Sequence, residues 1–185
     1  MEKLLTIPNA LTALRGIGIP IFLYLVLNRH ADGLAIVVLI IAGATDYFDG
    51  KLARAWNQTS RLGELMDPAI DRLYIAATLI ALYIRDAIPL WMVLIILGRD
   101  LTLGLMTIVM ARYQIAPFKV SYLGKAATFN LLYAFPLLLL ALSKSWFGTL
   151  AFIAGWSFAI WGIGLYLITG GIYFLHGWRS IVAAK

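Results

Sequence analysis

Residues 46 to 54 read Asp-Tyr-Phe-Asp-Gly-Lys-Leu-Ala-Arg, and Gly63, Asp67 and Asp71 follow at short intervals. Four aspartates and an arginine therefore stand close together in a chain that is otherwise almost wholly apolar. Charged side chains at the border of a bilayer are costly and usually functional. Carboxylates in this number suit divalent cations, and the arginine suits a phosphate. This stretch therefore predicts a functional site.

The composition of the whole chain is that of a membrane protein. Of its 185 residues, 62% are hydrophobic and only 13% are charged, against about 25% charged in soluble domains. The mean hydropathy is +0.89. The length suits one domain over residues 1–185. There is no cysteine, which excludes disulfides and thiolate metal sites. The net charge of +6 is spread over short inter-helix segments, so we expect anionic membrane lipid and no nucleic acid as partner.

Apolar segments long enough to cross a bilayer recur along the chain. We predict an all-α protein with six transmembrane helices, at residues 9–28, 33–53, 67–85, 88–111, 122–143 and 148–175. Lysines and arginines gather on one side, at positions 3, 51, 54, 61, 112, 119, 125, 179 and 185. The other side has positions 29, 85 and 144. The positive-inside rule then places both termini and the aspartates at the cytoplasmic face of the cell membrane.

Helical spacing brings the acidic side chains onto common faces. On a helix, positions 46, 49, 50 and 53 form one stripe, and Asp67 and Asp71 share a face of the next helix. The short link between the two helices lets the four aspartates converge. Oxygen ligands without histidine or cysteine suit Mg²⁺ or Mn²⁺, and four acids suit two ions that clamp a phosphoryl group. One acid can then serve as general base, while Arg54 contacts a diphosphate.

The full pattern resembles that of a known family. D-x2-D-G-x2-A-R-x8-G-x3-D-x3-D is the signature of the CDP-alcohol phosphatidyltransferases, and every fixed position is present here. The resemblance extends over the whole chain. It implies transfer of a phosphatidyl group from CDP-diacylglycerol to an alcohol, with release of CMP, by an enzyme that is typically a homodimer.

The resemblance also implies roles for individual residues. Asp46, Asp49 and Asp67 would hold the metals, and Asp71 would act as the base while also touching a metal. The residues implied to bind CDP-diacylglycerol are Asn9, Thr12, Gly50, Arg54 and Ser60. The segment 121–128 resembles the family's acceptor-side loop, and the basic residues on that side are Arg112, Lys119 and Lys125.

Two branches of the family resemble the chain, and they differ in the acceptor. Phosphatidylglycerophosphate synthases carry a second lysine in their Gly-Lys-x-Lys-Thr loop, where this chain has Ala127. Glycerol 3-phosphate is close to a dianion, so a missing lysine disfavours it. Phosphatidylglycerol is a monoanion that arrives through the membrane. The amino-acid sequences of these motifs are most similar to those of cardiolipin synthases of the actinobacterial type. We therefore expect phosphatidylglycerol as acceptor and cardiolipin as product, with glycerol 3-phosphate as the alternative.

Several residues keep two interpretations at this point. Asp67 precedes Pro68, as a helix N-cap would. Arg99 and Asp100 interrupt an apolar span either as a structural ion pair or as a substrate contact. Arg15 either snorkels to water or faces a polar interior. A divalent-cation transporter is a distant alternative function, because the acids lie at one membrane border and not near its midplane.

Overall fold

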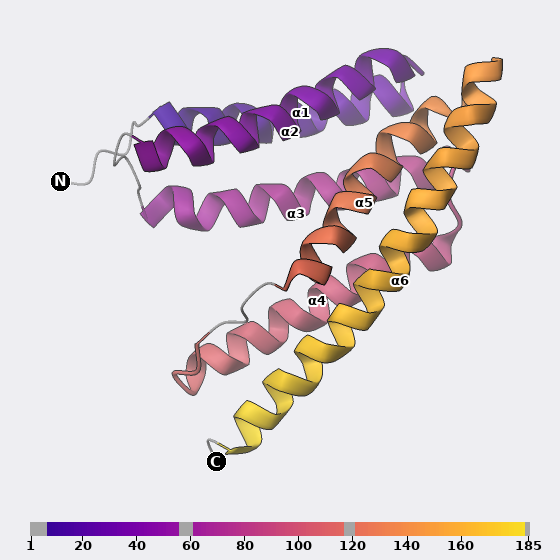
Figure 1. Cartoon of the computed structure of the whole chain (residues 1–185). Coiled ribbons are helices and arrows are strands. Elements are labelled where there is room, and N and C mark those ends of the chain that lie inside the picture. Colours follow the sequence, from indigo (N-terminus) through magenta and orange to yellow (C-terminus); the bar gives the residue numbers. More distant parts are fainter. Residues whose placement is uncertain (1–6, 56–60, 117–120, 184–185) are drawn as a thin grey trace. The chain divides into compact units, whose positions relative to one another are not determined.

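The computed structural model describes residues 7–55, 61–116 and 121–183, and it describes no side chains at 7–10, 46–55, 61–65 and 68. The regular elements are all helices (Figure 1), which confirms the all-α class. They are α1 (Ile7–Leu27), α2 (Asp32–Ala55), α3 (Arg61–Ile84), α4 (Leu90–Arg112), α5 (Tyr122–Leu140) and α6 (Trp146–Ala183). The chain divides into two compact units, Met1–Asp86 and Ala87–Lys185, with three helices each.

The first unit is built around the contact of α1 with α2 and α3. Its core contains Ala42 from α2 with Ile70 and Tyr74 from α3, and Ile19 of α1 packs against them. Phe22 of α1 is fully buried, and its ring centroid lies 6.4 Å from that of Tyr74. Because α2 reverses the chain direction, α1 and α3 run parallel. The starts of α1 and α3 therefore lie at the same end of the unit.

A charged contact holds the three helices together at the other end of this unit. The Arg85 guanidinium at the end of α3 donates to both carboxylate oxygens of Asp32, over 2.8 and 3.1 Å. The same Nη1 donates to the carbonyl oxygen of Val26 over 2.6 Å. A bidentate arginine–carboxylate pair of this kind is geometrically specific. It ties the end of α3 to the start of α2 and the end of α1.

In the second unit α6 packs against both α4 and α5. Glycines of α6 allow α5 to approach closely: a Cβ at Gly155 would lie 3.1 Å from Leu138 Cγ, and one at Gly162 would lie 3.0 Å from Leu131 Cδ2. Small residues in such positions let helix backbones come together within a membrane. The ends of α4 and α6 pack through Met110 and Ile181.

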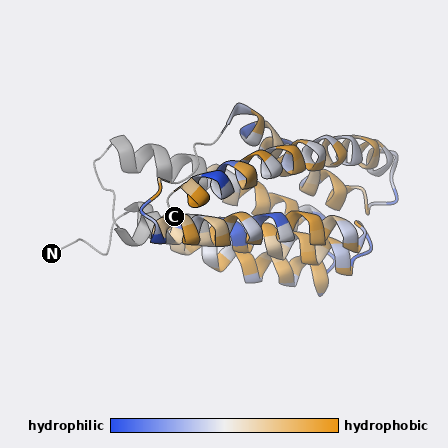
Figure 2. Ribbon diagram, turned by 90° about the horizontal axis from the view of Figure 1, so that it is seen from below, coloured by the Kyte–Doolittle hydropathy of each residue, from blue (hydrophilic) through white to orange (hydrophobic). Residues whose placement is uncertain are grey.

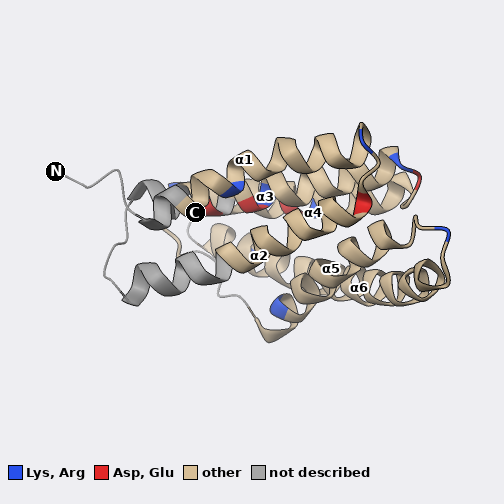
Figure 3. Ribbon diagram, turned by 90° about the horizontal axis from the view of Figure 1, so that it is seen from above, with Lys and Arg blue, Asp and Glu red and all other residues tan. Residues whose placement is uncertain are grey.

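The described helices have the apolar surfaces that lipid contact requires. By length and composition, α4, α5 and α6 can each cross a membrane, and shorter apolar stretches are Leu11–Leu27 and Asp32–Thr45. Hydrophobic residues cover most of these helices (Figure 2), and charged ones interrupt them at few places (Figure 3). Large apolar side chains such as Leu101 and Trp161 are exposed by 66% and 71%. The chain is a membrane protein with several apolar helices.

Two of the predicted segments differ from the observed helices by more than three residues at one end. α3 begins at Arg61 and not at 67, and α6 continues to Ala183 and not to 175. The prediction followed hydropathy, whereas arginine, leucine and glutamate also favour helix and extend it beyond the apolar part. Asp67 is therefore in the interior of α3. The interpretation of Asp67 as an N-cap is wrong, because an N-cap residue is not helical.

Candidate functional site

Two aspartates of α3 contact two polar side chains of α1. Thr12 Oγ1 donates a hydrogen bond to Asp67 Oδ1 over 2.6 Å. Arg15 Nη1 donates to Asp71 Oδ1 over 2.7 Å and forms an ion pair with it. The two aspartates are four positions apart and share a helix face, as the spacing predicts. The parallel course of α1 and α3 brings both pairs together in the same order.

The ion pair between Arg15 and Asp71 is unequal in burial. The Arg15 side chain is 2% exposed, whereas that of Asp71 is 44% exposed. A buried guanidinium needs an anionic partner, because a buried charge without one is strongly destabilising. Arg15 thus lies inside the unit, and the interpretation that it snorkels to water is wrong. Asp71 is held firmly at one oxygen while its carboxylate stays half exposed.

The last turns of α2 carry the other half of the predicted acidic site. The helix continues without a break to Ala55, so positions 46, 49, 50 and 53 fall on one stripe of its backbone. Only residues 56–60 separate α2 from α3, so the end of α2 lies near the start of α3. Leu39 of α2 and Met66 of α3 pack against the same small core. The backbone of α2 thus places these positions on one stripe, and their convergence with Asp67 and Asp71 stays a prediction.

Several predicted site residues lie outside the part that the structure describes. The side chains concerned are those of Asn9, Asp46, Asp49 and Arg54. Ser60 and Lys119 lie outside it entirely, while Gly50 is placed only as a helical backbone position. Their roles stay predictions.

The described acids have the chemistry that a hard cation prefers. Asp67 and Asp71 offer oxygen ligands one helical turn apart, and the Asp71 carboxylate is half exposed. Mg²⁺ and Mn²⁺ prefer such oxygen ligands. Among the described residues no three His, Cys, Asp or Glu side chains are grouped closely enough to hold a metal ion. The side chains of Asp46 and Asp49 lie outside the described part. The residues present thus fit a divalent metal.

The acceptor-side segment begins α5 and is fixed by α6. Ser121 is the N-cap of α5, and its hydroxyl accepts a hydrogen bond from the backbone N–H of Gly124 over 3.1 Å. The backbone N–H of Ser121 donates to the Tyr173 hydroxyl of α6 over 2.7 Å. A Cβ at position 124 would lie 2.7 Å from that hydroxyl, so only glycine fits without a shift. α6 therefore sets the geometry of this turn.

The described basic residues of the predicted acceptor side are solvent-accessible. Lys125 is exposed in the first turn of α5, with Nζ 5.7 Å from the ring centroid of Tyr122. Arg112 is exposed in the last turn of α4. Both side chains are placed to meet an anionic group at the surface, and their part in acceptor binding stays a prediction.

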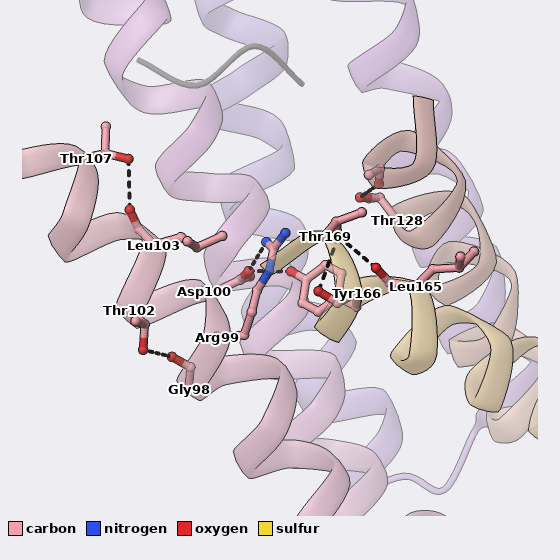
Figure 4. A network of polar contacts seen from close by, with 11 residues as sticks. Gly98, Arg99, Asp100, Thr102, Leu103, Thr107, Thr128, Leu165, Tyr166 and Thr169 are labelled. Atoms are coloured by element: carbon pink, nitrogen blue, oxygen red, sulfur yellow. Dashed lines mark hydrogen bonds and ion pairs between the residues drawn. The ribbon is translucent and has the colours of Figure 1, made fainter. Parts of the chain in front are cut away.

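A second charged network lies in the other unit, between α4 and α6 (Figure 4). Arg99 Nη1 contacts Asp100 Oδ1 over 3.0 Å, and the Tyr166 hydroxyl donates to the same oxygen. The Arg99 guanidinium also stacks 3.9 Å above the centroid of the Tyr166 ring. Of the two interpretations of Arg99 and Asp100, the structural ion pair is present in the structure. The contacts of Tyr166 with this pair join α4 to α6, and the Asp100 carboxylate at their centre is largely buried.

Tyr166→Phe should lower the stability of the protein. The change removes one hydrogen bond from the buried Asp100 carboxylate, which should cost about 1–3 kcal/mol. Thermal unfolding of the purified protein in detergent measures the effect. Tyr133→Phe is the matched control, because Tyr133 is 47% exposed. Equal losses of thermal stability in the two variants would contradict a special role for the Tyr166 hydroxyl.

Sequence reasoning did not pair Arg15 with Asp71 or Thr12 with Asp67, and it gave Tyr173 no role. One signal for α1 was available: Thr12 and Arg15 are polar and stand three positions apart in an apolar segment, so they share one helix face, as the two aspartates four positions apart also do. Tyr173 offers no comparable signal, because aromatic residues are common throughout α6.

Comparison with known proteins identifies the relatives of this chain. Residues 5–161 match the CDP-alcohol phosphatidyltransferase family. The chain is 48% identical to the cardiolipin synthase (CMP-forming) of Streptomyces coelicolor over 98% of its own length and 87% of that protein. It is 41% identical to a putative cardiolipin synthase of Mycobacterium tuberculosis, over 90% and 79%. It is 31% identical to the CDP-diacylglycerol–glycerol-3-phosphate 3-phosphatidyltransferase of Rickettsia felis, over 72% and 75%.

The chain belongs to the CDP-alcohol phosphatidyltransferase family. The family that the spacing of the aspartates predicted is thereby confirmed, and the protein is an enzyme of that class.

Proposed function

We propose that this enzyme is a cardiolipin synthase that transfers the phosphatidyl group of CDP-diacylglycerol to phosphatidylglycerol, giving cardiolipin and CMP. The observation that carries the proposal is the 48% identity to the Streptomyces enzyme over nearly the whole chain. The Streptomyces coelicolor and Mycobacterium tuberculosis relatives cover more of the chain, at higher identity, than the Rickettsia felis relative named for glycerol 3-phosphate.

The position of Ala127 supports the same acceptor. Glycerol-3-phosphate enzymes carry a lysine at the corresponding place, and here Ala127 is fully buried in α5. A lysine in that place would have to bury its charge or displace a packed neighbour, both of which are costly. The segment 121–128 thus has one lysine, Lys125, which suits a monoanionic diester better than a phosphate near a dianion.

The proposed chemistry is an in-line displacement at phosphorus. A hydroxyl oxygen of phosphatidylglycerol attacks the phosphorus that carries the diacylglycerol, and the bond from that phosphorus to the CMP oxygen breaks. Asp71 accepts the proton of the attacking hydroxyl. Its half-exposed carboxylate is accessible to the acceptor, while Arg15 holds its other side. Arg54, Gly50 and Ser60 bind the CDP part, with Asn9 and Thr12 near the nucleotide.

A divalent metal completes the proposed site, and enzymes of this family typically use one. Asp46, Asp49, Asp67 and Asp71 would hold Mg²⁺ or Mn²⁺, as a pair of ions. When bound, the ions supply positive charge that stabilises the phosphates during displacement. Thr12 fixes one oxygen of Asp67 by its hydrogen bond, which limits the orientations this ligand can take.

We further propose that all six helices cross the membrane, as one domain over residues 1–185, with both termini and the site at the cytoplasmic face. At 1.5 Å per residue, α1 with 21 residues and α2 with 24 are about 31 and 36 Å long, which matches a hydrocarbon core of about 30 Å. The excess of lysine and arginine on the side of the aspartates supports the orientation. The family resemblance supports a homodimer.

One assay tests the acceptor. Purified enzyme receives labelled CDP-diacylglycerol with either phosphatidylglycerol or glycerol 3-phosphate, and the lipid products are separated. We expect cardiolipin with the first acceptor and at most a trace of product with the second. Phosphatidylglycerophosphate formed with the second acceptor alone would refute the proposal and establish the alternative acceptor. Product from neither acceptor, with an active control enzyme, would also refute it.

A further inference from the structure

Buried polar side chains are rare in the described chain, and two of the five face the aspartates. They are Thr12 at 1% and Arg15 at 4% exposed, and the others are Thr78, Asp100 and Thr169. An apolar helix loses stability by burying such groups unless they find partners. α1 therefore places two buried polar side chains, one turn apart, against the two acids of α3.

The Arg15–Asp71 pair differs from a structural ion pair in the same unit. In the Arg85–Asp32 pair both side chains are largely buried, at 17% and 22% exposed, and two N–H groups bind the two carboxylate oxygens. In the Arg15–Asp71 pair the cation is buried, the acid is 44% exposed, and the bond reaches Oδ1. The first pair closes off its carboxylate. The second holds a carboxylate that remains accessible.

We propose that Arg15 is a positioning residue of the transfer reaction: it fixes the Asp71 carboxylate in the orientation in which it takes the proton of the acceptor hydroxyl. The inference rests on the proposed function of Asp71 and extends it to α1. Arg15 does not touch the substrate in this account. It acts through Asp71, and its own burial prevents the guanidinium from moving with the acid.

The physical reason is the sensitivity of proton transfer to geometry. A base must come within hydrogen-bond reach of the proton it removes. A displacement of about 1 Å in a reacting group can cost about 10²-fold in rate. Loss of Arg15 removes one restraint on the Asp71 carboxylate, so its orientation toward the acceptor is less well fixed.

The test compares Arg15→Met, Arg15→Lys and Arg85→Met in detergent-purified enzyme. We expect Arg15→Met to lower kcat about 10²-fold while KM for CDP-diacylglycerol changes less than about threefold. Arg15→Lys should recover part of kcat, because it restores the charge without the planar guanidinium. Arg85→Met breaks the Arg85–Asp32 ion pair of the same unit and should lower thermal stability with kcat per folded enzyme retained.

Binding of Mn²⁺, followed by electron paramagnetic resonance, gives a readout apart from activity. In Arg15→Met the affinity for Mn²⁺ should change much less than kcat, because Asp71 is one of four proposed ligands and the lost cation repels a divalent ion. A tenfold loss of Mn²⁺ affinity along with kcat would mean that Arg15 maintains the whole acidic site, and would overturn the proposal. Unchanged kcat in Arg15→Met would overturn it as well.

These outcomes are separable from a failure of the proposed function. The kcat ratio is measured with whichever acceptor the unmodified enzyme uses, so a different acceptor leaves the role of Arg15 testable. If Arg15→Met does not fold, Arg15→Lys is compared with the unmodified enzyme instead. A kcat of Arg15→Lys equal to that of the unmodified enzyme would then show that the reaction does not need a guanidinium at this position. If Asp71→Asn keeps full turnover, the base assignment fails first and the role of Arg15 fails with it.

Discussion

Asp71→Asn should reduce cardiolipin formation at least about 10³-fold while binding of CDP-diacylglycerol remains detectable. Asparagine has nearly the shape of aspartate but cannot accept the proton of the acceptor hydroxyl, and a general base contributes about 10²–10⁴-fold. Loss of a ligand charge near the metals adds to the effect. Turnover is measured as release of CMP, and donor binding is measured by titration calorimetry.

The same substitution should also destabilise the protein, which calls for a control. Arg15 is 4% exposed and would lose the charge of Asp71. Breaking a fully buried pair by removing one side costs about 3–5 kcal/mol, and the cost here is smaller because the Asp71 side chain is 44% exposed. Asp32→Asn is the matched control, because it breaks the Arg85 pair at the opposite end of the unit. Turnover near normal in folded Asp71→Asn would refute the base assignment, whereas inactivity of both variants would indicate a general loss of structure.

Removal of divalent metal should abolish activity, and addition of Mg²⁺ or Mn²⁺ should restore it. Positive charge on the phosphates contributes several kcal/mol to catalysis, so we expect at least about 10³-fold loss in excess chelator. Four aspartates without histidine or cysteine would bind the ions. CMP release is measured in chelator and after titration with each metal.

The control for this experiment is the stability of the metal-free protein. Helix packing in the described units uses apolar contacts and the Arg85–Asp32 pair, neither of which needs an ion. The protein should therefore keep its helical circular dichroism in chelator. Full activity after exhaustive chelation would contradict the metal assignment, and irreversible unfolding would show that the ions are structural.

Much of the fold could be predicted because its signals are local. Apolar runs gave six helices whose positions agree with the structure, since a segment in a bilayer must satisfy its own backbone hydrogen bonds. The bounds of α3 and α6 were wrong where charged or polar residues continue a helix beyond its apolar part. Only α4, α5 and α6 reach the length and hydropathy of a span within the described residues.

The site could be predicted in part. The four aspartates follow helical spacing, which a sequence displays directly, and this spacing indicated the family that the comparison shows, while their roles stay predictions. The partner of Arg15 could not be predicted, because a buried arginine near several acids has several possible partners. The hydrogen bond between Tyr173 and the N-cap residue Ser121 of α5 could not be predicted either, since it joins residues 52 positions apart.

The sequence by itself determined the class of this protein, its family and the oxygen-ligand character of its acidic site. These depend on composition and on spacing within single helices. Only the tertiary structure decided which α1 side chains meet the aspartates. The Arg15–Asp71 contact joins residues 56 positions apart, and it exists because α1 and α3 lie parallel in one register, which no local pattern specifies.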